Sequence, residues 1–237
     1  MKERLFFRVG NDFTCMDQNG YVAHESYMVL MKNSGLYFLE PGIIEKINAN
    51  AEGYFDFSKA LLDIGCEIGE YSQWTDFAYY YMFDGNRDKI TVANFNMLIR
   101  GKADIVETHA VLLSDRNGKT AYDGFIGDEL AGTVTNKDEV KTVETVTLDS
   151  FNIENVGLIK IDVEGMEEKV LRGGVGTIIR NDYPPILFEL WDAGTKNMPA
   201  EKHQRLVKFL QGLGYEIIWN WGDEQTHLAI KRYTITI

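Results

Sequence analysis

Short apolar segments alternate with amphipathic ones along most of the chain. The apolar segments are rich in Val, Ile, Leu and aromatic residues, which favours buried β-strands, at 59–64, 78–83, 104–113, 157–163 and 184–190. The segments between them suit helices, which are expected at 67–77, 86–100, 164–172 and 199–213. Strands that alternate with helices predict a mostly parallel sheet with helices on both faces.

Turn and cap residues add detail to this pattern. Asn86 suits the N-cap of the helix at 86–100, and Gly101 suits its C-terminal stop. Segments 216–219 and 227–232 predict a terminal antiparallel pair. The β-prone stretches 119–125 and 142–148 predict a hairpin-like insertion at 119–147, whose loop contacts substrate or lies on the surface.

Residues 1–58 are expected to form an N-terminal extension or cap on a main domain of residues 59–237. A short strand is predicted at 5–9, and a short helix at 43–47 after the break at Pro41-Gly42. The segment 27–31 fits either a strand or a helix. The extension is expected to pack over the core, either as a lid or as a purely structural cap.

The composition and charge of the chain limit the classes of binding partner that it can have. The chain has 237 residues, 45% of them hydrophobic, and a formal net charge of −12. This acidic balance, without a Lys/Arg run, argues against nucleic acid and an anionic membrane surface. The sequence holds no apolar run of about 18 residues, no signal-peptide pattern and no cysteine framework, so a cytoplasmic protein is expected. The oligomeric state is left open, with a homodimer as one option.

An acid and two glycines follow the first predicted strand. Asp63 ends that strand, Gly65 and Gly69 follow, and a helix-compatible segment opens behind them. A strand, a glycine turn and a helix in this order build a nucleotide-type site at the end of a parallel strand. The glycines are expected to let the backbone approach a ligand closely, because neither has a side chain in the way.

The acids around this turn indicate the kind of ligand. Glu67 stands where the dinucleotide pattern Gly-x-Gly-x-x-Gly has its middle glycine, and a carboxylate there would repel a pyrophosphate. An acidic turn favours a cationic ligand such as S-adenosylmethionine, which has no phosphate. Asp84 ends the second predicted strand, the place for a carboxylate that accepts both ribose hydroxyls. Alternatively, Asp63 and Asp84 only cap neighbouring helices.

Five motifs together resemble the FkbM family of S-adenosylmethionine-dependent methyltransferases. They are DIGCEIG at 63–69, FDGN at 83–86, TLD at 147–149, LIKIDVEGME at 158–167 and PILFE at 185–189. The resemblance implies the Rossmann-like class I methyltransferase fold, an α/β fold whose mostly parallel seven-stranded sheet has a terminal antiparallel strand. The chain departs from the family pattern at Cys66-Glu67, usually Ala-Asn, and at Asp84-Gly85, usually Glu-Pro.

The resemblance also implies a cofactor site. Its expected residues are Asp63, Gly65, Cys66, Gly69, Asp84, Gly85, His109, Ala110 and Asp162. Among them, Asp84 is expected to bind the ribose, and His109 and Ala110 to lie near the adenine. A structural or surface histidine is the alternative for His109.

Methyl transfer to oxygen needs alignment of the acceptor and help in removing its proton. The candidate catalytic residues are Asp162, Glu189 and Lys160, at or near the ends of adjacent strands. Lys160, Asp162 and Glu164 would share one face if their strand continued that far. Asp162 is the preferred group beside the methyl. A pair of Asp162 with Glu189 could raise one pKa or bind Mg²⁺, although a metal is not favoured. The acids at 164 and 167 also suit the first turn of a helix.

The function expected from these observations is O-methylation of a small hydroxylated substrate, such as a glycan or a secondary metabolite. Two alternatives stay open: a metal-dependent methyltransferase of another acceptor, and a non-catalytic S-adenosylmethionine-binding scaffold. Lys160 and Asp162 are also similar to part of the Lys-Asp-Lys-Glu set of RNA ribose methyltransferases. As strand neighbours on one face of an acidic chain they fit that class poorly.

Overall fold

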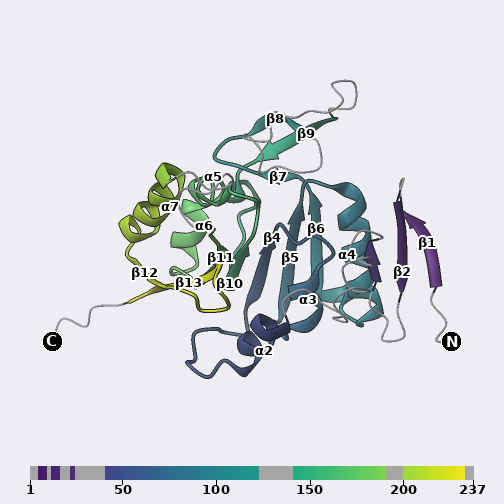
Figure 1. Ribbon diagram of the computed structural model, residues 1–237, viewed down its shortest axis with the longest axis horizontal. Helices are drawn as coiled ribbons and strands as arrows, with labels where there is room; N and C mark the ends of the chain where they lie inside the picture. Colours follow the sequence, from purple (N-terminus) through teal and green to yellow (C-terminus); the bar gives the residue numbers. More distant parts are fainter. Residues whose placement is uncertain are drawn as a thin grey trace.

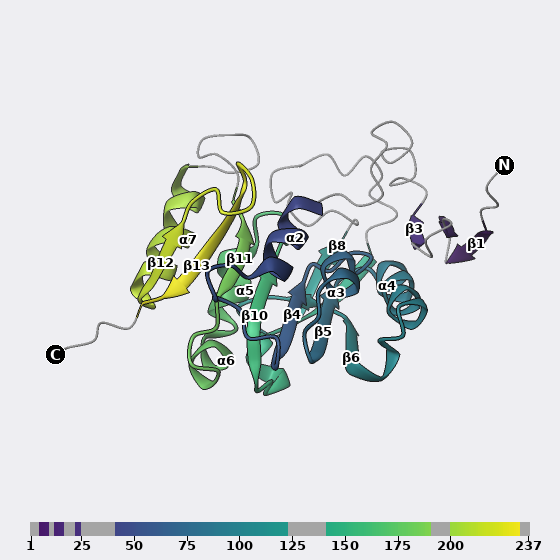
Figure 2. The same cartoon turned by 90° about the horizontal axis from the view of Figure 1, so that it is seen from below.

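A seven-stranded sheet forms the centre of the molecule (Figure 1). The computed structural model describes residues 5–9, 12–16, 22–24, 41–122, 141–190 and 200–232. The strands of the central sheet are, in chain order, β4 (Ala60–Ile64), β5 (Tyr79–Asp84), β6 (Val106–Ala110), β10 (Val156–Ile161), β11 (Ile186–Glu189), β12 (Tyr215–Ile218) and β13 (Thr226–Lys231). Their spatial order is β12-β13-β11-β10-β4-β5-β6, which can be followed across Figure 2.

The strand directions confirm the fold class expected from the sequence. β6, β5, β4, β10 and β11 pair in parallel, whereas β13 is antiparallel to both of its neighbours, β11 and β12. Parallel neighbours need a crossover connection, here through helices, whereas the final β12–β13 hairpin places β13 in the opposite direction. The predicted terminal antiparallel pair is therefore present.

Helices cover both faces of this sheet. They are α2 (Pro41–Ala49), α3 (Glu70–Trp74), α4 (Arg87–Ile99), α5 (Glu167–Arg172), α6 (Val175–Arg180) and α7 (Ala200–Gly212), with 3₁₀ turns η1 (Ala103–Ile105) and η2 (Leu148–Phe151). Apolar residues of α2, α3 and α4 bury one face, and those of α5, α6 and α7 bury the other. Among the described residues, every helix is too short or too polar to cross a bilayer.

Two small sheets flank the central one. β1 (Leu5–Val9), β2 (Asp12–Met16) and β3 (Val22–His24) form an antiparallel sheet beside α4 (Figure 1). β8 (Gly118–Tyr122) and β9 (Lys141–Val146) form the predicted antiparallel hairpin, and β7 (Leu112–Leu113) pairs in parallel with β9. The loop of this hairpin and the segment 27–31 lie outside the described residues.

The described part of the N-terminal extension contributes to the core. The predicted short helix is α2, and its Ile43, Ile44 and Ile47 are buried beside Trp221 and Leu228. At about 25 cal/mol per Å² of apolar surface, three buried isoleucines stabilise this contact by several kcal/mol. The domain boundary at residue 58 stays a prediction.

Two predicted helices begin later than their patterns indicate. α3 begins at Glu70 because Glu67 and Gly69 have φ values of +52° and +78°, which are incompatible with a right-handed helix. α5 begins at Glu167 because Glu164 and Gly165 have φ values of +54° and +85°. Both delays leave an irregular turn at the carboxyl edge of the sheet.

The helix expected at 164–172 ends at Arg172 as predicted, with Gly173 as its C-cap, and α6 follows after Gly174. These two glycines also permit close packing: a Cβ on Gly173 would lie 2.0 Å from the Ser114 carbonyl oxygen. The strand expected at 104–113 is divided, because its end joins the β8–β9 sheet as β7. Asn86 caps α4 as predicted, accepting hydrogen bonds from the N–H groups of Asp88 and Lys89.

Candidate cofactor and catalytic site

The carboxyl ends of four neighbouring parallel strands bring the predicted site residues to one edge of the sheet. Asp63 and Asp84 lie at the ends of β4 and β5, Asp162 follows β10, and Glu189 ends β11. Asp63 and Lys160 are register partners on adjacent strands, as are Lys160 and Leu187. Side chains at matching register face the same side, so this edge gathers acids around one lysine.

Residues 65–69, here called the donor turn, connect β4 to α3. Gly65 has a φ of +71°, and a Cβ there would stand 1.7 Å from the carbonyl oxygen of Asp162. A Cβ on Gly69 would stand 2.5 Å from Cε of Met82. The N–H groups of Gly65 and Cys66 both donate to the Phe83 carbonyl. At both positions the protein itself leaves no room for a side chain, in addition to the expected close approach of a ligand.

Asp84 is held by the backbone on both sides of its carboxylate. Oδ2 accepts a hydrogen bond from the Glu67 N–H at 3.1 Å, and Oδ1 accepts one from the Asn86 N–H at 2.7 Å. Burial raises the pKa of Asp84 to about 6, against the opposing effect of Lys89. A carboxylate has about four acceptor positions, so two remain for other donors. Gly85 separates Asp84 from Asn86 in the chain.

Glu67, the unusual acid of the donor turn, is paired. Its Oε1 lies 2.7 Å from Nζ of Lys89, which projects from α4. The two side chains are 29% and 26% exposed. The sequence pattern contains no signal for this pair, because the partners are 22 positions apart and meet only through the irregular turn.

Lys160 links three parts of the site. Its Nζ donates to the Gly65 carbonyl at 3.1 Å and lies 3.9 Å from Oδ1 of Asp63 and 3.6 Å from Oδ2 of Asp162. Asp63 has no exposed surface, and its Oδ2 accepts a hydrogen bond from the Ser72 hydroxyl at 2.7 Å. Burial raises the pKa of Asp63, and Lys160 opposes that rise. Asp63 therefore anchors Lys160 and α3 from inside the protein.

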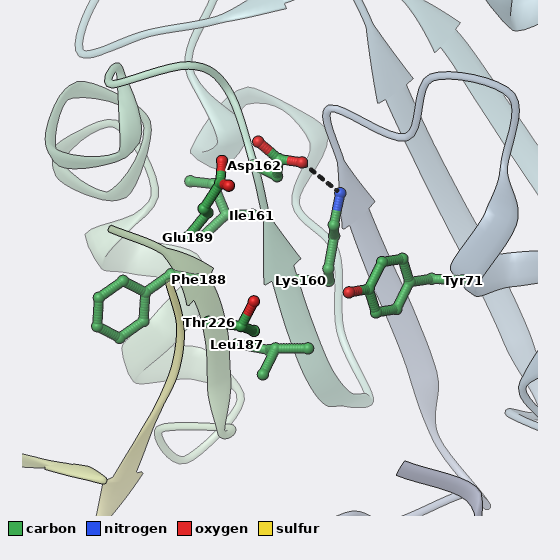
Figure 3. A pocket seen from close by; sticks show the side chains of 8 residues that line it. All are labelled: Tyr71, Lys160, Ile161, Asp162, Leu187, Phe188, Glu189 and Thr226. Atoms are coloured by element: carbon green, nitrogen blue, oxygen red, sulfur yellow. Dashed lines mark ion pairs between the residues drawn. The ribbon is translucent and has the colours of Figure 1, made fainter. Parts of the chain in front are cut away.

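The three candidate catalytic residues line one pocket (Figure 3). Its empty space is about 200 Å³ and is open to solvent. The lining residues are Tyr71, Lys160, Ile161, Asp162, Leu187, Phe188, Glu189 and Thr226. Asp162 and Glu189 line the pocket from the ends of β10 and β11, and the Tyr71 hydroxyl points toward Lys160 (Figure 3).

The two acids of the turn after β10, Glu164 and Glu167, differ in their surroundings. The strand ends at Ile161, so Glu164, with its positive φ, does not continue the face of Lys160 and Asp162. Glu167 lies in the first turn of α5, as predicted, and is only 2% exposed. Its Oε1 accepts hydrogen bonds from the N–H groups of Val163 and Gly165, at 3.2 and 3.0 Å. Burial raises its pKa to about 7. These bonds reach back from the first residue of α5 to the turn before it, and the sequence carries no capping-box pattern there that would have indicated them.

His109 and Ala110 face opposite sides of the sheet. The His109 ring stacks on Phe83, with centroids 4.8 Å apart, and packs against Phe151. Burial lowers the pKa of His109, while the nearby Glu107 carboxylate opposes that change. Ala110 pairs with Asp84 and packs in the core cluster on the α4 side. A role of either residue beside adenine stays a prediction.

Cys66 and the grouping of possible metal ligands are the remaining features of the site. The Cys66 thiol is buried, and burial raises its pKa, so it stays a neutral packing group. Within the part of the chain that the structure describes, no three His, Cys, Asp or Glu side chains are grouped to hold a metal ion.

Comparisons with known proteins identify a family and a fold. The family model of the methyltransferase FkbM domain matches residues 63–217. The fold is similar to the crystal structure of methyltransferase FkbM from Methylobacillus flagellatus KT, with a TM-score of 0.56 and 17% identity. That match covers 81% of this chain and 48% of the other, so this chain spans about half of that protein.

A second solved structure shows the same fold over nearly its full length. It is a putative caffeoyl-CoA O-methyltransferase from Staphylococcus aureus, with a TM-score of 0.54 and 12% identity. The match covers 88% of this chain and 91% of that one. The comparison with curated proteins found no match.

Proposed function

Because this chain belongs to the FkbM family of S-adenosylmethionine-dependent methyltransferases, we propose that it methylates a hydroxyl group of a small substrate. A sugar or a secondary metabolite is the acceptor class that we favour. The observation that carries this proposal is the pocket in which Lys160, Asp162 and Glu189 meet beside the donor turn.

The residues present fit this methyl donor. Asp84 is fixed by two backbone N–H groups and keeps acceptor positions for the ribose hydroxyls. The surrounding acids suit a cationic ligand without phosphate. When bound, S-adenosylmethionine supplies an electrophilic methyl group on a sulfonium. The donor turn and Asp84 would hold it. Lys160, which lines the pocket, donates a hydrogen bond to the Gly65 carbonyl of that turn.

Asp162 is the group that we assign to the acceptor proton. In the overall reaction the acceptor oxygen forms a bond to the methyl carbon, the carbon–sulfur pair stays on sulfur, and Asp162 takes the hydroxyl proton. The Nζ of Lys160, 3.6 Å from Oδ2 of Asp162, holds that carboxylate beside the donor turn. Glu189 and Thr226 face the same pocket and can accept hydrogen bonds from further hydroxyls, which orients the acceptor.

A metal-free reaction is the form of this proposal that the contacts favour. The carboxylate oxygens of Asp162 and Glu189 are suitable Mg²⁺ ligands. However, the Lys160 ammonium already lies against Asp162, and a second cation there would be repelled. The metal-dependent and scaffold alternatives are distinguished by the experiment that follows.

The test begins with calorimetric titration of the protein with S-adenosylmethionine. Methyl transfer is then measured against a panel of glycans and hydroxylated metabolites, with and without chelator. We expect Asp162→Asn to keep donor binding and lose transfer. Full activity of Asp162→Asn would remove it as the base, and loss of transfer in chelator would establish the metal. Donor binding without transfer to any acceptor would favour the scaffold.

A further inference from the structure

Lys89 joins the two segments that hold Asp84. Its Nζ lies 2.7 Å from Oε1 of Glu67 in the donor turn, while Lys89 itself belongs to the first turn of α4. The same turn of α4 is capped by Asn86, whose N–H donates to Asp84. The Glu67 N–H donates to the other oxygen of Asp84. The contacts form a closed ring through Asp84, Glu67, Lys89 and Asn86.

This ring stabilises a costly backbone conformation. Glu67 has a φ of +52°, which costs a residue other than glycine roughly 1–2 kcal/mol. In this conformation its N–H donates to Oδ2 of Asp84 at 3.1 Å. An ion pair to a capped helix is the contact that holds the Glu67 side chain in place. The ion pair therefore acts on the orientation of Asp84 through the backbone of Glu67.

We propose that Lys89 is a positioning residue for the methyl donor, which locks the donor turn through Glu67 so that Asp84 presents its remaining acceptor positions to the ribose. This inference rests on the proposed use of S-adenosylmethionine. It concerns the residues by which this chain departs from the usual family pattern. It gives Glu67 a structural role in the donor turn, because its carboxylate is paired with Lys89.

The charges around Asp84 give the proposal a second readout. Lys89 from α4 favours the ionised form of Asp84, and Glu67 from the donor turn opposes it. The buried Cys66 thiol also lies near Asp84, and Glu164 lies near both Glu67 and Lys89. Removal of the Lys89 charge leaves Glu67 uncompensated, so Asp84 should take up a proton at a higher pH. Donor affinity would then decline at a higher pH as well.

The experiment measures S-adenosylmethionine affinity by calorimetry between pH 5.5 and 8.5 for the full chain and its variants. We expect Lys89→Met to weaken binding about 5- to 30-fold and to move the acidic decline to higher pH. Lys89→Arg should restore most of the affinity. The double variant Glu67→Gln/Lys89→Met should bind no more weakly than Lys89→Met, because both changes break one contact. Lys59→Met, which removes an ion pair with Asp56 at 3.5 Å before β4, is the matched control.

Three outcomes would overturn the inference. They are an affinity of Lys89→Met within twofold of the wild type, an unshifted pH profile, and a double variant that binds clearly more weakly than Lys89→Met. A Lys89→Met variant that loses thermal stability yet binds normally would show a merely structural ion pair. Absence of donor binding by the wild type would instead refute the proposed function, and the inference with it.

Discussion

Replacement of Lys160 by methionine would leave a buried acid without its partner cation. Asp63 has no exposed surface, and its Oδ1 lies 3.9 Å from the Lys160 ammonium. Methionine keeps much of the side-chain volume, so the change removes charge and a hydrogen bond rather than packing. The expected effect is a large loss of stability that depends on pH.

The size of that loss follows from the geometry. Two unit charges 3.9 Å apart attract by about 4 kcal/mol at an effective dielectric constant of about 20. Breaking a buried pair by removal of one partner typically costs about 3–5 kcal/mol. The ion pair with Asp162 adds little, because that carboxylate is 35% exposed and screened by solvent. We therefore expect Lys160→Met to lose about 3–5 kcal/mol of unfolding free energy at pH 8.

The sign of the pH dependence is fixed by Asp63. Burial already raises its pKa, and Lys160 opposes the rise, so the variant has a still higher pKa. An acid whose pKa is raised on folding contributes stability at low pH, and that contribution is lost as pH rises through the folded value. The deficit of Lys160→Met should accordingly be largest at pH 8 and shrink toward pH 5.

Urea unfolding at pH 5 and pH 8 measures both quantities. The double variant Asp63→Asn/Lys160→Met removes the buried charge and should recover most of the loss at pH 8. A Lys160→Met deficit below about 1 kcal/mol, or a double variant no more stable than the single one, would contradict the reasoning. If the single variant does not fold, recovery by the double variant still decides the question.

Three further predictions concern other acids of the site. S-adenosylmethionine affinity should fall as pH drops through about 6, because protonated Asp84 loses acceptor capacity, and Asp84→Asn should abolish this dependence in calorimetry. Asp162→Asn should lower kcat at least 100-fold with unchanged donor affinity, about the contribution of a general base. Glu167→Gln should be more stable than the wild type at pH 8 by up to about 3 kcal/mol. The reason is that burial raises the pKa of Glu167 from 4.5 to about 7, and the stabilising contribution of such an acid is lost as pH rises through that range. Urea unfolding of this variant at pH 5 and pH 8 should show that difference vanish at the lower pH.

The sequence predicted the parts of this protein that depend on local pattern. Apolar runs located the parallel strands, and Asn86 located the start of α4. Acids at the ends of successive strands must meet at one edge of a parallel sheet, so Asp162 and Glu189 could be placed together in advance.

The remaining features depend on contacts between distant residues. The pairing of Glu67 with Lys89 requires a left-handed backbone at a residue that is not glycine. Gly173 and Gly174 permit close packing against Ser114 and Leu148, which a helix-stop rule cannot foresee. The burial of Glu167 likewise follows from how the turn after β10 folds back on α5.

The contact between Gly65 and Asp162 has a consequence for protein engineering. A Cβ at residue 65 would collide with the Asp162 carbonyl, so the loops of β4 and β10 must be inherited or exchanged together. A chimera that joins β4 from one relative to β10 from another would have to preserve both backbones at once. Redesign of acceptor preference is better begun at Leu187 and Thr226. They line the pocket from β11 and β13, two strands that do not pair with β4.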